Sequence, residues 1–170
     1  MFAFDAGIRY SKGYYYLFTA SLFESKYTGS DGVERNTAFN GNYVFNTLVG
    51  KEFKLSEDKS LVLDVKVTFA GGKRYTPIDE VASLTQGGNF TTVYFENQAY
   101  SKQFEPYLKA DVKIGFKLDR KKITQEWQFF IENVTNQKNV LMQSYSKSKQ
   151  AIVNTYQLGI FPMMQYKLYF

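Results

Sequence analysis

The chain has 170 residues, 18% of them aromatic, and carries a formal net charge of +5. It contains no Cys and no His, which excludes disulfides, thiolate catalysis, zinc sites of the usual ligand types and every His-based catalytic relay. The positive charge does not indicate a nucleic-acid partner, because the Lys residues are scattered and usually have an acidic residue nearby. The uncharged apolar stretch at residues 14–23 is about half of what a membrane-spanning helix needs, so no such helix is expected.

Seven segments show the two-residue period of a β-strand, in which successive side chains point to opposite faces. The first covers residues 2–10, the second 14–27 and the third 42–55. The second segment begins with apolar residues at both odd and even positions, so the sequence does not show which side chains share a face. In the first, the apolar positions are Phe2, Phe4, Ala6, Ile8 and Tyr10, and the opposite positions are Ala3, Asp5, Gly7 and Arg9.

The fourth strand, expected over residues 61–70, has the clearest division between its faces. One face is a continuous apolar stripe, and the other carries charges of both signs. The same division returns over residues 108–118, 123–132 and 164–170. The stripe of the fourth strand consists of Leu61, Leu63, Val65, Val67 and Phe69.

Short and long connections alternate between these strands. Tight polar turns of hairpin type are expected at residues 11–13, 56–59 and 119–121, and long polar connections at roughly 28–41, 72–103 and 135–158. This alternation is typical of outer-membrane barrels, whose short turns face the periplasm and whose long loops face outside. The predicted fold is all-β, an antiparallel up-and-down meander of about seven strands.

The apolar stripes allow two interpretations. In a soluble protein they would fill an interior, and the chain would be a small stand-alone β-barrel that binds a ligand. In a transmembrane barrel they would face lipid. Three features favour the second interpretation: the stripes finish in aromatic residues, as at Tyr10, Phe53, Phe116 and Tyr166; charges of opposite sign share the other face; and the last strand ends on Phe170.

The end of the chain resembles that of a known family. Phe170, preceded at alternate positions by Leu168 and Tyr166, resembles the membrane-assembly signal that the barrel-assembly machinery reads. The segment Asn133-Val134-Thr135-Asn136-Gln137-Lys138-Asn139 resembles a signature near the C-terminus of TonB-dependent transporters. Segments 21–32, 46–53, 71–79 and 156–162 look like the branch of that family that bears carboxypeptidase-regulatory-like N-terminal domains, so the resemblance covers nearly the whole chain.

The resemblance implies a place in a larger protein. In the family, this region is the last third of a transmembrane barrel of about 22 strands that is filled by a plug domain. Residues 1–170 are therefore expected to be a fragment, the C-terminal portion of such a barrel without its plug. The implied function is that of a wall segment of a TonB-dependent receptor, which takes up a nutrient ligand across the outer membrane of a Gram-negative bacterium.

The implied partners are outer-membrane lipid, the remaining strands and plug of the parent protein, TonB through the missing N-terminal part, and the barrel-assembly machinery. Alone, the fragment is expected to self-associate through its unpaired edges. In the family, external loops contribute ligand contacts, and by this resemblance Arg74, Tyr75, Tyr94 and Tyr100 in the connection 72–103 are candidates. A surface loop that is simply rich in polar and aromatic residues is the commoner explanation.

No enzymatic activity, cofactor or metal is expected. Asp79 and Glu80 are adjacent carboxylates and could suggest a cation site. Because a hard cation takes more than two oxygen ligands, they are interpreted as a solvated pair in a loop. The glycine pairs at 71–72 and 87–88 lack the context of a phosphate loop and are interpreted as turn or hinge glycines. Charged residues of the polar faces are expected to pair across strands or with a plug: Arg9, Asp64, Lys66, Lys109, Asp111, Lys113, Glu132 and Lys167.

Overall fold

The computed structural model of the chain describes residues 2–85 and 92–170, with the side chains of residues 5–11 left aside. The glycine pair at 87–88 and the side chains of Arg9 and Tyr10 lie outside the described residues. The rest is an all-β chain whose only helical segments are two short ones among the described residues, α1 (Glu80–Thr85) and η1 (Glu96–Gln98). Within this described part, no helix has the length and apolar character needed to cross a membrane.

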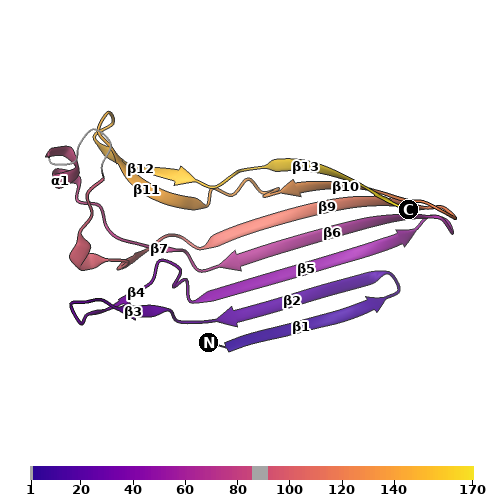
Figure 1. Ribbon diagram of the computed structural model, residues 1–170, viewed down its shortest axis with the longest axis horizontal. Helices are drawn as coiled ribbons and strands as arrows, with labels where there is room; N and C mark the ends of the chain where they lie inside the picture. Colours follow the sequence, from indigo (N-terminus) through magenta and orange to yellow (C-terminus); the bar gives the residue numbers. More distant parts are fainter. Residues whose placement is uncertain (1, 86–91) are drawn as a thin grey trace.

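Seven strands form one antiparallel sheet in which each strand pairs with the next one along the meander (Figure 1). The predicted all-β meander of seven strands is confirmed, and most strand ends fall within one or two residues of the prediction. The strands of this sheet are β1 (Phe2–Ser11), β2 (Tyr14–Leu22), β5 (Tyr43–Lys54), β6 (Lys59–Ala70), β9 (Tyr107–Asp119), β10 (Thr124–Glu132) and β13 (Phe161–Tyr169).

The three tight turns lie together at one end of the sheet, and the three long connections extend from the other (Figure 1). The sequence predicted the long connections only by their length and polarity. Each contains a two-stranded ribbon. In the first and third ribbons, residues with left-handed φ, Gly32 and Gln150, let the chain fold back between the two strands. The ribbons are β3 (Lys26–Thr28) with β4 (Glu34–Asn36), β7 (Arg74–Tyr75) with β8 (Lys102–Gln103), and β11 (Val140–Ser146) with β12 (Ala151–Tyr156).

The second strand is also shorter than predicted. It ends at Leu22 rather than continuing to residue 27, and Lys26 begins the first ribbon. The tip of that ribbon turns at Gly32, whose φ of 74° belongs to the left-handed region. Arg35 closes the tip with a two-point contact to Asp31, at 2.6 and 2.9 Å. A bidentate pair of this kind fixes the geometry of a short turn.

The strand register divides the sheet into two faces, since residues directly opposite each other on neighbouring strands share a face. One face, called the apolar face here, carries the predicted stripe of β6 and the residues paired with it on all the other strands. It also carries Tyr14, Tyr16, Phe18, Ala20 and Leu22, which assigns the faces of β2. The other face, called the polar face, carries most of the charges of the sheet.

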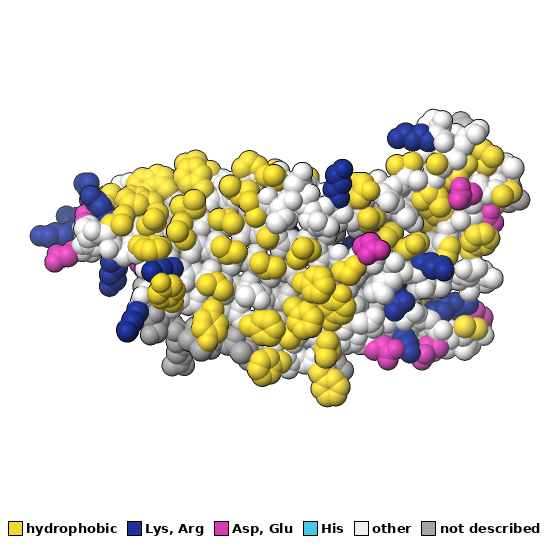
Figure 2. All heavy atoms as spheres, turned by 180° about the vertical axis from the view of Figure 1, so that it is seen from behind, with side chains coloured by type: hydrophobic (Ala, Val, Ile, Leu, Met, Phe, Trp, Pro, Cys, Tyr) yellow, Lys and Arg dark blue, Asp and Glu magenta, His cyan; other side chains and the backbone are white. Residues whose placement is uncertain are grey.

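Burial in this sheet is inverted relative to a soluble protein. Val65, Ile114, Leu63 and Leu168 are 46%, 44%, 38% and 39% exposed. Among residues with described side chains, Ile78 in a long connection is the one buried hydrophobic residue. The buried side chains of the sheet are polar, as at Asp64 and Gln128. A soluble domain of this size buries an apolar core, whereas this sheet is a single layer with an open apolar face (Figure 2).

Candidate functional site

Aromatic side chains lie in two bands across the apolar face. Near the tight turns, Phe53, Leu61, Phe116, Trp127 and Tyr166 stand opposite one another in a single row across five strands. The Trp127 ring lies 5.8 Å from that of Phe116 and 5.4 Å from that of Tyr166, between centroids. These distances are typical of interacting aromatic pairs. Three of the four residues predicted to end the stripes therefore share one row, and Tyr10 lies outside the described side chains.

The second aromatic band lies toward the long connections. The Tyr43 ring is 5.6 Å from that of Phe45 and 5.4 Å from that of Phe69, and Phe18 stacks on Phe45 at 6.4 Å. Between the bands the face is mainly aliphatic, as at Val65, which pairs with Val49 and Val112. From Leu61 to Phe69 is a step of eight residues, which spans about 27 Å along a strand.

The polar face holds ion pairs that cross between strands, as predicted. Lys113 Nζ lies 2.6 Å from Asp64 Oδ2, joining β9 to β6. Lys109 Nζ lies 2.7 Å from Glu132 Oε2 on β10 and 3.4 Å from Asp111 Oδ1 on its own strand. Charges that are withdrawn from water need such partners. The predicted pairing across strands is confirmed for Asp64, Lys113, Lys109 and Glu132, whereas the ion pair of Asp111 lies within its own strand.

Gly50 makes room for a contact that reaches across three strands. The Tyr15 hydroxyl of β2 donates a hydrogen bond to Asp64 Oδ1 of β6, and β5 lies between them. The Tyr15 ring crosses over Gly50: a Cβ built there would lie 2.2 Å from Tyr15 Cζ and 2.3 Å from Asp64 Oδ1. An aromatic ring that covers a strand glycine in this way helps to fix the register.

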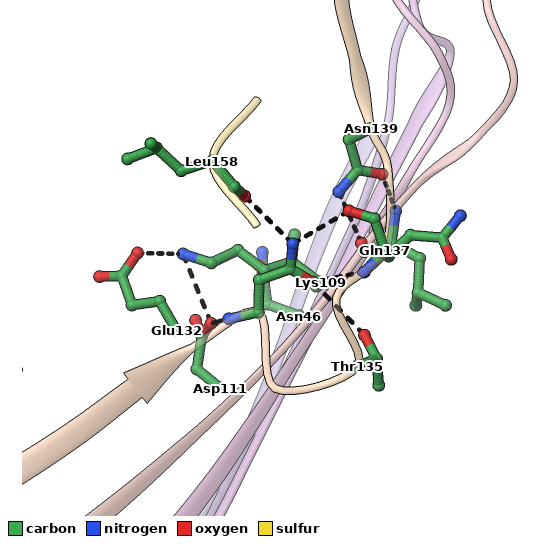
Figure 3. Close-up of polar contacts among 11 residues, drawn as sticks. Asn46, Lys109, Asp111, Glu132, Thr135, Gln137, Asn139 and Leu158 are labelled. Carbon is green, nitrogen blue, oxygen red and sulfur yellow. Dashed lines mark hydrogen bonds and ion pairs between the residues drawn. The ribbon is translucent and has the colours of Figure 1, made fainter. Parts of the chain in front are cut away.

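Asn133 organises the segment that resembles the transporter signature. Its partners Asp111, Gln137 and Leu158 are labelled in Figure 3. Asn133 is only 2% exposed and has a left-handed φ of 50°. Its side-chain amide donates to the carbonyl oxygens of Gln137 and Leu158 at 3.0 and 3.1 Å, and its Oδ1 accepts from the Gln137 N–H at 3.0 Å. Its own N–H donates to Asp111 Oδ1 at 2.9 Å, which ties the segment to the charged pairs of the polar face.

The other asparagines of the segment also have structural roles. Asn136 adopts a left-handed φ of 52°, a conformation that Asn tolerates better than most residues. Asn139 accepts from the Leu108 N–H at 3.1 Å and donates to the Leu108 carbonyl at 2.8 Å, so its side chain pairs with β9 as a strand would. The segment thus anchors the β11–β12 ribbon to the sheet, and its sequence pattern has a physical explanation within this chain.

The four candidate ligand-contact residues, Arg74, Tyr75, Tyr94 and Tyr100, line one cavity of about 520 Å³. All three long connections contribute to its wall. Tyr27 of the first connection contacts Tyr100 edge-on, with 6.4 Å between the ring centroids. The third connection contributes Leu141, Met142 and Gln143. Tyr75 stacks on Phe104 at 4.2 Å. Sequence reasoning found the residues of the second connection but missed the contributions of the other two.

Arg74 has a structural role in this cavity. Its Nε donates to the Asn40 carbonyl at 3.0 Å, its Nη2 reaches Asn42 Oδ1 at 3.4 Å, and its N–H donates to the Ala38 carbonyl at 2.9 Å. These bonds join the first and second long connections. Two nitrogens of the guanidinium, Nε and Nη2, therefore bind the chain itself, and six aromatic side chains contribute to the wall around it.

Three glycines allow the backbones to meet beside the cavity. A Cβ on Gly71 would lie 1.7 Å from the Gly41 carbonyl oxygen, and one on Gly72 would lie 1.9 Å from that of Phe104. Gly71 and Gly72 are therefore needed for close backbone approach, which corrects their interpretation as turn or hinge glycines.

The carboxylate pair has a local explanation. Asp79 Oδ1 accepts from the Ala82 N–H at 2.8 Å, as a cap of α1 does. Glu80 is exposed in the first turn of the same helix. Among the residues that the structure describes, no group of three or more acidic side chains is arranged to hold a metal ion.

The predicted membrane-assembly residues lie at the edge of the sheet. Tyr166 and Leu168 belong to β13 and stand on the apolar face, and Phe170 follows the strand and is almost fully exposed.

These features define a seven-stranded antiparallel wall with one apolar and one polar face, with a loop-built cavity at one end. In comparisons with protein families, curated proteins and solved structures, no match was found.

Proposed function

We propose that this chain is part of the wall of a transmembrane β-barrel of the TonB-dependent receptor kind, in the outer membrane of a Gram-negative bacterium. The apolar face lies against lipid and the polar face lines the lumen. The long connections face outside and take part in capturing a nutrient ligand. The tight turns lie on the periplasmic side. The observation that carries this proposal is the inverted burial, with exposed apolar side chains and buried polar ones.

The dimensions of the apolar face support the proposal. The two aromatic bands are about 27 Å apart along the strands. Strands in such barrels tilt by about 35–45°, so the bands are separated by about 21 Å along the membrane normal. The apolar band of an outer-membrane barrel is about 25 Å tall and is flanked by aromatic girdles.

The open edges of the sheet require further strands. β1 and β13 each have one neighbour in the sheet, so each leaves a row of backbone N–H and C=O groups on its outer side. Such groups cannot be left unpaired in lipid. In the proposed barrel they pair with the remaining strands of the parent protein. In isolation the chain self-associates through them, and a monodisperse monomer in detergent-free buffer would contradict this.

The cavity among the long connections supports the ligand-capture part of the proposal. Six of its fifteen lining residues are aromatic, and its volume is within the range of small-molecule sites. It lies at the end of the wall that would face outside. Ligand sites are concentrated on loops that a rigid scaffold positions.

Trp127 provides a direct test, because it is the one tryptophan of the chain and lies on the apolar face in the band near the tight turns. The chain is folded into phosphatidylcholine vesicles whose acyl chains carry bromine at a chosen depth, and Trp127 fluorescence is measured. We expect strong quenching by bromine near the headgroup and weaker quenching by bromine near the bilayer centre. Iodide added to the water should quench little.

The rival interpretation gives a different result. A soluble barrel with an apolar interior would keep Trp127 away from lipid, so bromine at any depth would leave its fluorescence unchanged. It would also stay soluble without detergent and bind an apolar dye. Either result would overturn the proposed orientation of the wall.

A further inference from the structure

Lys51 interrupts the apolar rows of this face near its tight-turn end. Lys51 of β5 stands opposite Tyr14 of β2 on one side and Leu63 of β6 on the other, so its side chain starts on the apolar face. Its row continues through Ile114, Phe129 and Met164. A charge among apolar side chains needs a compensating interaction.

Aromatic groups hold the Lys51 ammonium. Its Nζ lies 4.2 Å from the centroid of the Tyr14 ring and 4.6 Å from that of Phe53, and it donates a 2.5 Å hydrogen bond to the Tyr14 hydroxyl. Phe53 belongs to the aromatic row, two positions nearer the turn, so the side chain leans toward the end of the sheet. Long cationic side chains in a membrane extend toward the interface in this way.

Among the side chains that the structure describes, one accepts a hydrogen bond from this ammonium. An ammonium has three N–H donors, and one of them is used on the Tyr14 hydroxyl. Because that hydroxyl accepts from Lys51, its own O–H remains able to donate. Among the described residues, ion pairs form on the polar face and in the first ribbon, but none involves Lys51. Aromatic faces attract the cation without neutralising its charge.

The same end of the molecule is rich in further cations. Lys59 begins β6 on the apolar-face side, opposite Leu118, and Lys12 lies in the first tight turn. The third tight turn supplies Arg120, Lys121 and Lys122. Figure 2 shows Lys and Arg side chains gathered at the left end of the apolar face, which is the tight-turn end. Of the acidic groups there, Asp119 pairs with Lys117 and Asp58 accepts from Ser56.

We propose that Lys51 and the Tyr14 hydroxyl bind the phosphate of a membrane phospholipid at the tight-turn edge of the apolar face. This inference rests on the proposed function, because it requires lipid against that face. The remaining ammonium protons and the Tyr14 O–H donate to phosphate oxygens, and the acyl chains lie along the aliphatic region beyond Leu63. The cations of the turns raise the local concentration of anionic headgroups. The site is reached from the apolar side, which favours a lipid over free phosphate.

The test measures bound lipid on the folded chain in uncharged maltoside micelles, by native mass spectrometry during titration with phosphatidylglycerol. Lys51→Met keeps the length of the side chain and removes its charge. Loss of a charged hydrogen bond should weaken retention of the lipid by roughly tenfold or more. Lys51→Arg should restore most of the retention, and Tyr14→Phe should lower it by a few-fold. The matched control, Lys66→Met, removes a lysine from the polar face of β6 and should change nothing.

Several outcomes would overturn the inference. Equal retention by the native chain and Lys51→Met would do so, as would equal retention of diacylglycerol, which has the same acyl chains without phosphate. Full displacement of the lipid by inorganic phosphate would assign the site to a free anion instead. Heat-dependent migration in gels confirms that each variant is folded. If Lys51→Met does not fold, lipid retention is compared between the native chain, Lys51→Arg and Tyr14→Phe. Quenching of Trp127 by brominated lipid is independent of Lys51, so the membrane proposal can succeed where this one fails.

Discussion

Placing an arginine at Val65 gives the sharpest contrast between a lipid-facing and a water-facing sheet. Val65 stands on the apolar face, four residues from Leu61 in one aromatic band and four from Phe69 in the other, and is 46% exposed. In a membrane this position lies near the bilayer centre, where Arg costs about 2–4 kcal/mol, and the cost falls to about 0–1 kcal/mol near the interface. In water, an exposed substitution changes stability by no more than about 0.5 kcal/mol.

The assay is equilibrium unfolding in phosphatidylcholine vesicles, followed by Trp127 fluorescence. We expect Val65→Arg to lower the free energy of unfolding by about 2–4 kcal/mol, and Leu61→Arg, in the aromatic row, to lower it by about 1 kcal/mol or less. Lys66→Arg is the matched control, because it places the same guanidinium on the polar face one residue away, and it should have no measurable effect.

The depth dependence is the decisive part of this prediction. A loss below about 0.5 kcal/mol for Val65→Arg, or equal losses at Val65 and Leu61, would refute the assignment of the apolar face to lipid. A packed soluble interior would also penalise both positions, without regard to their distance from the aromatic bands.

Three further predictions concern the polar face and the connections. Gly50→Ala should lower the free energy of unfolding by about 1–3 kcal/mol because its Cβ would collide with Tyr15, whereas Gly115→Ala, whose nearest contact would be 3.6 Å, should have little effect; denaturant titration compares them. Asn133→Ala should cost at least about 2 kcal/mol and loosen the β11–β12 ribbon, seen as faster amide exchange there, since buried carbonyl groups lose their donor. The Arg35 hydrogen bond is the main cause that lowers the pKa of Asp31 to about 2, so the ion pair stabilises the first ribbon above the ordinary pKa of 3.8 and is lost as pH falls through about 2. Arg35→Gln should raise this pKa toward 3.8, and an NMR titration that still gave about 2 would contradict this explanation.

The cavity shows why part of the candidate site escaped sequence reasoning. Tyr75, Tyr94 and Tyr100 lie in one connection and were found because that connection is long and aromatic. Tyr27 and Met142 lie in the connections before and after it, and nothing local in the sequence places them beside the others. Contacts between connections depend on which strands are neighbours, and therefore on the whole meander.

The sequence by itself determined the strands, the tight turns and the division of the sheet into two faces. A two-residue period of apolar side chains requires a strand with one apolar face, and a shift of one residue would turn every stripe over. The pattern therefore excludes such a shift, and the short hairpin turns limit larger ones; the faces of the second strand were assigned only by its pairing in the structure. The aromatic row through Phe53, Phe116, Trp127 and Tyr166 is a consequence of that register.

Only the tertiary structure decided how the long connections fold and what the polar groups do. The ribbons are short and depend on left-handed turn residues such as Gly32, and on close backbone approach at Gly71. The contact of Tyr15 with Asp64 needs a third strand that offers no side chain between them. Asn133 reaches carbonyl groups that are distant in sequence. Each of these depends on positions in space that a local period does not encode.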